Sequence, residues 1–178
     1  MQYLIHNSGD HLELSKKSDN RKIVSGVWWI TWGKYKSEIL DNNDNLIYTI
    51  SRKFSFWKWK MSFIVKSPSG EIFLVEGKNK SHTIYQSVIK ENIFEIKIHK
   101  KRKKSVFKNG VQIASIDESF VSVFGESKGH IITNSPENII EIFTLFFCLN
   151  FGEKNDNSLQ FNFGNIGKAE LIDENWKP

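Results

Sequence analysis

The segment Lys97–Lys108 carries seven cationic side chains and no acidic one. Five of them are consecutive: Lys100, Lys101, Arg102, Lys103 and Lys104. Such a run must lie at a turn or at a strand end, because the alternation of a strand would otherwise place lysines in the core. The charge suits a phosphate-bearing partner, and near an anionic membrane each basic residue contributes about 1 kcal/mol. It is also typical of a solvated hairpin tip whose lysines prevent edge pairing.

A second segment, residues 52–60, interleaves aromatic and cationic side chains. Indole rings lie at headgroup level in membranes, and aromatic rings also stack on single-stranded bases. The alternative is that Phe54, Phe56 and one tryptophan are core residues, since large aromatic side chains are mostly buried. The candidate anion-binding residues here are Arg52, Lys53, Lys58 and Lys60, and the candidate aromatic contacts are Trp57 and Trp59.

The sequence offers little for catalysis. Cys148 lies between Phe147 and Leu149, where a buried thiol is inert. The histidines show no metal-ligand spacing, and neither a Gly-rich phosphate loop nor a G-x-S-x-G motif is present. The acidic stretch 41–45 does not continue as a calcium loop, because Arg52 stands where an EF-hand needs its bidentate glutamate. We therefore expect no enzyme activity, no catalytic residues, no metal and no cofactor.

Length and composition favour one domain over residues 1–178, in which 151–178 form a C-terminal extension. The chain has 178 residues and is 39% hydrophobic, which is enough for a single core. The formal net charge of +5 suits an anionic partner but can equally serve solubility. Cys148 is the only cysteine, so an internal disulfide is excluded and a reducing compartment is favoured. Residues 1–10 do not look like a secretory signal, and we expect a cytoplasmic protein.

Short segments with a periodicity of two dominate the sequence and predict a mainly β protein. In Ile93–His99, for example, Ile96 and Ile98 share one face, and Glu95, Lys97 and His99 share the other. Asn109-Gly110 predicts a type I′ hairpin turn, because both central residues of that turn need positive φ. The expected strands are 3–6, 11–15, 22–30, 36–40, 46–53, 60–66, 71–77, 82–89, 93–100, 104–108, 111–116, 120–124 and 130–133, with weaker ones at 159–163 and 168–173.

One helix is expected over residues 136–150. Pro136 fits its first turn, and the hydroxyl of Ser135 is expected to cap it. Between Ile139 and Leu149 only Glu141 and Thr144 are polar, so the helix is apolar around most of its circumference and must be enclosed. It is shorter than the roughly 20 residues that cross a bilayer, and no transmembrane segment is expected.

A closed antiparallel β-barrel of about 12 strands would enclose the apolar helix and would leave no strand edge exposed. About a dozen strands with one apolar face each would leave long exposed edges unless the sheet closed on itself. The closed sheet has an apolar lumen, and the helix can fill it. Glu141 must then reach the barrel mouth or find a cationic partner.

The order of these parts resembles the tubby C-terminal-like superfamily, which includes tubby proteins, phospholipid scramblases and LURP-one-related proteins. The resemblance spans roughly residues 20–150. It is carried by the unit 44–53, the turn Pro68-Ser69-Gly70, the hairpin 107–116 and the apolar helix. It implies a closed barrel around a central helix, no catalytic constellation shared across members, and action at membranes or on phosphoinositide headgroups. The chain departs from the family layout by continuing about 28 residues past the helix.

We expect a non-enzymatic module that engages anionic surfaces, foremost membrane phospholipid headgroups, through its basic and aromatic hairpins. It would then be cytoplasmic and peripheral at the inner face of the membrane. The alternative is a protein-interaction module with an acidic partner, such as a bacterial immunity protein that neutralises a toxin. Nucleic acid is a less favoured partner, because arginines are few and no recognition motif is visible.

Overall fold

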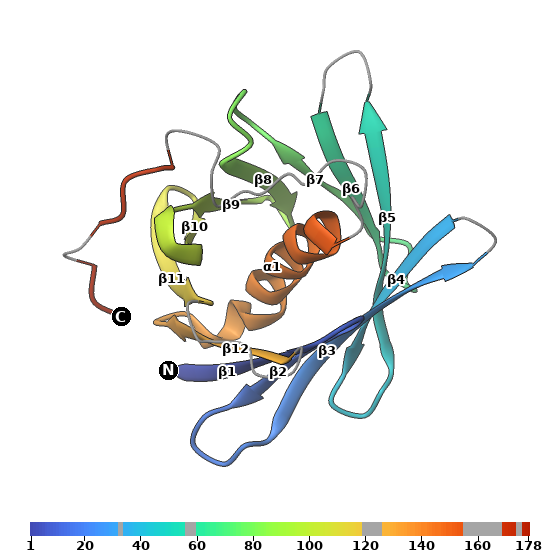
Figure 1. Ribbon diagram of the computed structural model, residues 1–178, viewed down its shortest axis with the longest axis horizontal. Helices are drawn as coiled ribbons and strands as arrows, with labels where there is room; N and C mark the ends of the chain where they lie inside the picture. Colours follow the sequence, from blue (N-terminus) through green and yellow to red (C-terminus); the bar gives the residue numbers. More distant parts are fainter. Residues whose placement is uncertain (32–33, 56–59, 119–125, 155–168, 174–175) are drawn as a thin grey trace.

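The computed structural model is a closed antiparallel barrel of twelve strands around one helix (Figure 1). It describes residues 1–31, 34–55, 60–118, 126–154, 169–173 and 176–178. The strands are β1 (Gln2–Ser8), β2 (His11–Lys16), β3 (Lys22–Thr31), β4 (Lys34–Asp41), β5 (Leu46–Ser55), β6 (Lys60–Lys66), β7 (Ile72–Gly77), β8 (Ile84–Ile89), β9 (Asn92–Ile98), β10 (Lys103–Lys108), β11 (Val111–Asp117) and β12 (Glu126–Thr133). Each pairs with its neighbours in sequence, and β1 pairs with β12 to close the ring. The predicted fold class is confirmed.

The predicted strands match this ring with a few differences. The expected strand 120–124 and the expected strand 159–163 lie outside the described residues. The expected strand 168–173 is wrong over its described part, since residues 169–173 have no regular secondary structure. β11 contains a β-bulge, because Val106 of β10 pairs with Ala114 while Phe107 pairs with Gln112. Ile113 is the additional residue, so it and Ala114 are both buried.

The helix α1 (Ile139–Lys154) runs through the barrel and follows a 3-10 turn, η3 (Pro136–Asn138). The predicted cap by Ser135 is wrong. Its hydroxyl donates to the carboxylate of Glu137 and accepts from Asn138 Nδ2, so it is not free for the helix N–H groups. No helix in the described parts of the chain is long and apolar enough to cross a membrane.

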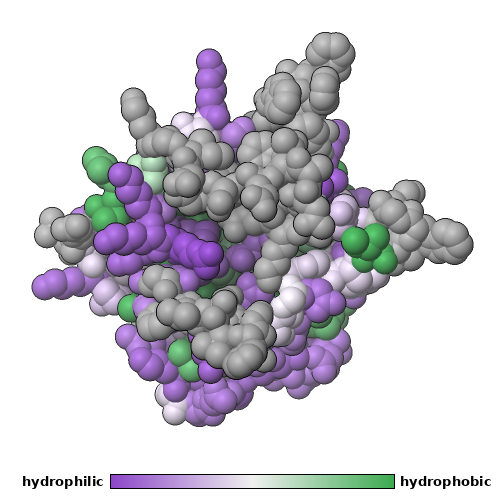
Figure 2. All heavy atoms as spheres, viewed as in Figure 1, coloured by the Kyte–Doolittle hydropathy of each residue, from purple (hydrophilic) through white to green (hydrophobic). Residues whose placement is uncertain are grey.

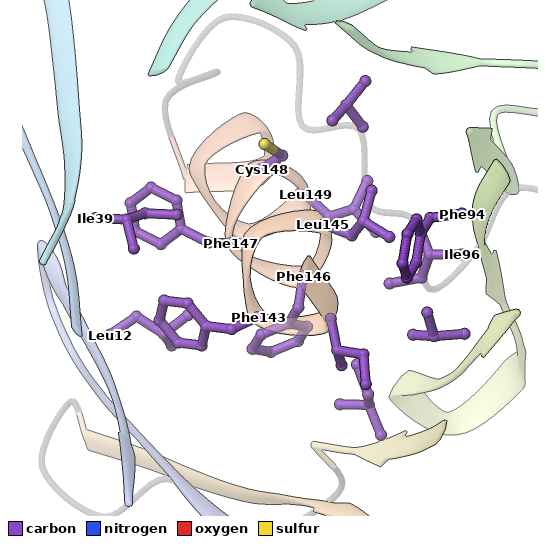
Figure 3. Close-up of a cluster of buried hydrophobic side chains, with 14 of the residues drawn as sticks. Leu12, Ile39, Phe94, Ile96, Phe143, Leu145, Phe146, Phe147, Cys148 and Leu149 are labelled. Atoms are coloured by element: carbon purple, nitrogen blue, oxygen red, sulfur yellow. The ribbon is translucent and has the colours of Figure 1, made fainter. Parts of the chain in front are cut away.

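The helix fills the lumen with side chains on all sides, as its sequence requires. Every residue from Ile142 to Cys148 is fully buried. Figure 3 shows Phe143 and Phe147 pointing toward β2 and β4, while Leu145 and Leu149 point the opposite way, toward β9. Among the few polar groups in this core, Thr144 Oγ1 donates to the Ile140 carbonyl at 2.7 Å, so the hydroxyl is satisfied within the helix.

Glu141 meets the inner wall near Tyr48 of β5. Its side chain is half-buried, and its Oε2 has no hydrogen-bond partner among the described residues. Burial, together with the charges of Glu141 and Glu71, raises the pKa of Tyr48 to about 12. Tyr48 therefore stays neutral at physiological pH and packs edge-on against Phe73 at 5.4 Å between ring centroids.

The helix closely approaches the wall at Gly26 of β3. A Cβ at this position would lie 2.2 Å from Cε2 of Phe147. The Phe147 ring cannot easily move away, because it is fully buried and packs against Trp28 at a centroid distance of 5.5 Å. Glycine at position 26 thus lets the aromatic side of the helix contact the backbone of β3.

Replacing Gly26 by Ala is expected to lower the free energy of unfolding by about 1–3 kcal/mol through overpacking. Urea unfolding of the full chain measures this. Gly77→Ala is the matched control, since the nearest atom to a Cβ there is 3.5 Å away. A second change, Phe147→Leu, should recover part of the loss. Equal stabilities of the Gly26→Ala and Gly77→Ala proteins would contradict this packing.

Candidate functional site

The two predicted cationic segments lie at the same end of the barrel. Because each strand pairs antiparallel with the next, every second connection falls at the same end of the barrel. At this end the connection after β7 lies between the connection after β5 and the connection after β9. We call this the basic end. Its described, solvent-exposed cations are Lys53, Lys78, Lys80, Lys100, Lys101 and Arg102. Trp57, Lys58 and Trp59 lie outside the described residues, and of Lys60 only the backbone is described.

Lys78 and Lys80 were not among the predicted site residues. They occupy the connection between β7 and β8, next to the one between β9 and β10. No local signal distinguishes them in the sequence, because two isolated lysines near a turn are ordinary. The pairing of each strand with the next in sequence places them between the two predicted segments.

The connection between β9 and β10 is a tight turn, η2 (Lys100–Arg102). Lys101 and Arg102 both have a φ of 58°, and the Lys103 N–H donates to the Lys100 carbonyl. This is the backbone of a type I′ turn, in which non-glycine residues are unfavourable by about 1 kcal/mol each. Lys100, Lys101 and Arg102 are all exposed, and within the described parts of the chain none forms an ion pair. Figure 2 shows hydrophilic side chains gathered on the face where β9 and β10 lie in Figure 1.

The remaining two members of the run do not belong to this exposed surface. Lys103 is partly exposed, with its Nζ 3.7 Å from Asp117 Oδ2. Lys104 is buried, its ammonium paired with the Glu118 carboxylate and lying 5.3 Å from the centroid of the Phe146 ring. Its assignment as a surface anion-binding residue is therefore wrong, because Lys104 is the second residue of β10 and the alternation of that strand turns it inward.

Arg52 also points inward, whereas its neighbour Lys53 is exposed. In β5 the residues Tyr48, Ile50 and Arg52 share the lumen face. The guanidinium of half-buried Arg52 lies 5.3 Å from the ring centroid of Tyr35, within cation–π range. Arg52 thus belongs to the aromatic mouth of the lumen, and Lys53 is the member of this pair that faces solvent.

The C-terminal segment is fixed to the basic end through Glu170. The Glu170 N–H donates to the Ile98 carbonyl at 3.2 Å, and its Oε1 accepts from Thr83 Oγ1 at 2.8 Å and from Asn79 Nδ2 at 3.3 Å. Farther along, Trp176 Nε1 donates to the Gln112 carbonyl at 3.1 Å. Figure 1 shows the segment outside the barrel beside β10 and β11. Nothing local in the sequence indicated this attachment.

His99 connects the barrel to this segment. The expectation that His99 faces solvent is wrong: it contacts Ser105 and Glu170 on the outer side of the barrel, where the C-terminal segment leaves it only 5% exposed. Its Nδ1 lies 2.8 Å from the Glu170 carbonyl oxygen, which can only accept, so Nδ1 carries the proton. Nε2 then accepts from Ser105 Oγ at 2.9 Å. Burial is the main cause that lowers the pKa of His99 from its usual value, and the imidazole is neutral at pH 7.

A groove of about 670 Å³ lies between the turn and the C-terminal segment. One wall carries Lys100, Lys101 and Lys103, and the other is formed by residues 169–172. His99 lies at the boundary between the two walls. The carboxylate of Glu170 is engaged by Thr83 and Asn79, both neutral, and makes no ion pair with these lysines. The groove therefore offers cationic groups beside an apolar side chain, Leu171, which is 95% exposed.

Neither the thiol nor a metal cluster supplies chemistry within the described residues. Burial raises the pKa of the Cys148 thiol, which is fully enclosed by the core, so it is not a thiolate at pH 7. In the described parts of the chain no three His, Cys, Asp or Glu side chains lie close enough to hold a metal ion. What the basic end can do chemically is attract and hydrogen-bond anions.

Comparison with family models, curated proteins and solved structures finds no match to this chain. The superfamily resemblance therefore stays a prediction.

The buried neutral His99 predicts a loss of stability in mild acid. Its pKa is lower in the folded than in the unfolded chain, so the unfolded chain binds more protons, and the free energy of unfolding falls as the pH falls below about 6.5. We expect urea unfolding at pH 7.5 and pH 5.0 to show a smaller acid-induced loss for His99→Asn than for the natural protein. Identical losses in the two proteins would rule out His99 as a source of the pH dependence.

The positive φ of Lys101 and Arg102 in η2 should be less unfavourable for Asn-Gly. We therefore expect Lys101→Asn combined with Arg102→Gly to raise the free energy of unfolding by about 1–2 kcal/mol. Thermal or urea unfolding measures the change. Lys101→Gln combined with Arg102→Gln is the control, since it removes the same charge without relieving the backbone. Equal stability of the two double variants would show that the turn is unstrained.

Proposed function

We propose that the protein is a non-enzymatic binding module whose basic end engages anionic phospholipid headgroups at a membrane surface. The observation that carries this proposal is the group Lys100, Lys101 and Arg102: three adjacent exposed cations without an ion pair in the described residues, on a turn in which Lys101 and Arg102 have positive φ. Positive φ at residues other than glycine is backbone strain of the kind that clusters at functional sites, and it favours a function over simple solvation.

The arrangement suits a flat anionic partner. The connections after β7 and β9 present exposed lysines at one barrel end, so one surface can contact them together. The exposed side chain of Leu171 lies beside the turn, and cations next to apolar groups are typical of surfaces that bind at the membrane interface. Lys53, near the end of β5, adds an exposed cation at the same end of the barrel.

The three cations give a measurable contribution. At about 1 kcal/mol each, neutralising all three is expected to weaken binding to anionic vesicles by about 3 kcal/mol, roughly a hundredfold. We expect Lys100→Gln, Lys101→Gln and Arg102→Gln together to abolish co-sedimentation with phosphatidylserine-containing vesicles at low salt. Vesicles of phosphatidylcholine alone should not be bound by either protein.

The matched control removes the same charge from the opposite end of the barrel. Lys17, Arg21 and Lys66 are exposed and lie in or beside the connections after β2 and β6. Their replacement by Gln should reduce binding far less than the change at the turn. Absence of binding to anionic vesicles by the natural protein would refute the lipid proposal, and equal losses in the two triple variants would refute the assignment to the basic end.

A further inference from the structure

We infer that the groove between the basic turn and residues 169–172 is a specific site for one amphiphilic phosphate, that is, a phosphate group with an apolar chain attached, such as a single anionic phospholipid. This inference rests on the proposed function and goes beyond general attraction to a charged surface. It assigns to the C-terminal segment the role of forming the second wall of a ligand site.

The phosphate would bind at the lysine wall. Lys100 and Lys101 are exposed, line the groove and have no ion pair within the described chain. Lys103 lines the same wall and is only loosely paired with Asp117, at 3.7 Å. Ammonium groups on flexible stems bind phosphate as point charges, so these three lysines can converge on one phosphate group.

The apolar part of the ligand would contact the opposite wall. Ala169, Leu171 and Ile172 line it, and Leu171 is 95% exposed. An aliphatic side chain this exposed beside three lysines gains free energy only when something apolar covers it. A volume of about 670 Å³ is within the range of small-molecule sites, so it can accept a headgroup with part of its chain.

The wall is held in place before any ligand arrives. Glu170 is fixed through its N–H, its carbonyl and its carboxylate, so residues on either side of it keep their position relative to the turn. The same contacts engage the Glu170 carboxylate with Thr83 and Asn79, so the acidic group does not pair with the lysines and the phosphate does not have to displace it. A site fixed in this way loses little entropy on binding.

The test uses monomeric ligands, so that binding to a surface cannot substitute for binding to the groove. Isothermal titration calorimetry of the full-length protein would compare dihexanoyl phosphatidic acid below its micelle concentration, glycerol 3-phosphate, inorganic phosphate and dihexanoyl phosphatidylcholine. We expect saturable one-to-one binding of the phosphatidic acid, about tenfold or more tighter than either free phosphate compound, because only the lipid also covers the apolar wall. Equal affinities for phosphatidic acid and inorganic phosphate would overturn the inference in favour of a free-anion site.

The variants assign that binding to the groove. Leu171→Asp should weaken phosphatidic acid binding at least tenfold, and Leu171→Met should retain it. Val111→Asp is the matched control, because Val111 is 66% exposed, lies at the other end of the barrel and undergoes the same change in charge. Both positions are at the surface, so neither change should affect folding. Equal binding by Leu171→Asp and Val111→Asp proteins would overturn the inference.

The vesicle and calorimetry experiments together distinguish failure of the groove inference from failure of the proposed function. If the natural protein binds anionic vesicles but shows no saturable binding of monomeric phosphatidic acid, the proposed function stands and the groove is not a lipid site. If it binds neither, both are wrong.

Discussion

The structure depends on mutual enclosure of the helix and the sheet. An apolar helix with almost no polar face cannot remain in water, and twelve strands with one apolar face each cannot remain an open sheet. Closing the sheet around the helix buries both surfaces and removes the strand edges. The fit is tight at Gly26, where the absence of a side chain admits Phe147 against the wall. The core therefore has an architectural role, and it leaves the ends of the barrel for function.

The antiparallel order of the strands also arranges the surface. Antiparallel neighbours place alternate connections at the same end, so segments separated by twenty or more residues in sequence become neighbours around one rim. Lys78, Lys80 and the turn Lys100–Arg102 lie together for this reason. The C-terminal segment adds a wall to the same end through Glu170, and the result is a groove whose two sides differ in chemistry.

The sequence predicted the parts of the structure that follow from local periodicity. The apolar helix, most strands and the Asn109-Gly110 turn are confirmed, because each has a signal within a few residues. The predictions that failed concern residues whose position depends on contacts with distant parts of the chain. Lys104 was expected at the surface, but alternation in β10 and the carboxylate of Glu118 place it inside. His99 and the segment 169–173 could not be placed, because their hydrogen bonds join residues about seventy positions apart.

If the basic end engages anionic membranes, it must face the membrane in the bound protein, and the orientation of the bound protein can be measured. A spin label can be attached at Lys80→Cys, at the basic end, or at Asn43→Cys, in the turn at the opposite end, since Cys148 is fully buried and will not react. Electron paramagnetic resonance with a lipid-soluble and a water-soluble relaxant then measures how close each label lies to the surface of phosphatidylserine vesicles. If the basic end faces the membrane, vesicles shield the label at position 80 from the water-soluble relaxant, and the relaxation of the label at position 43 does not change. Shielding of position 43 alone, or no difference between the two labels, would contradict this orientation.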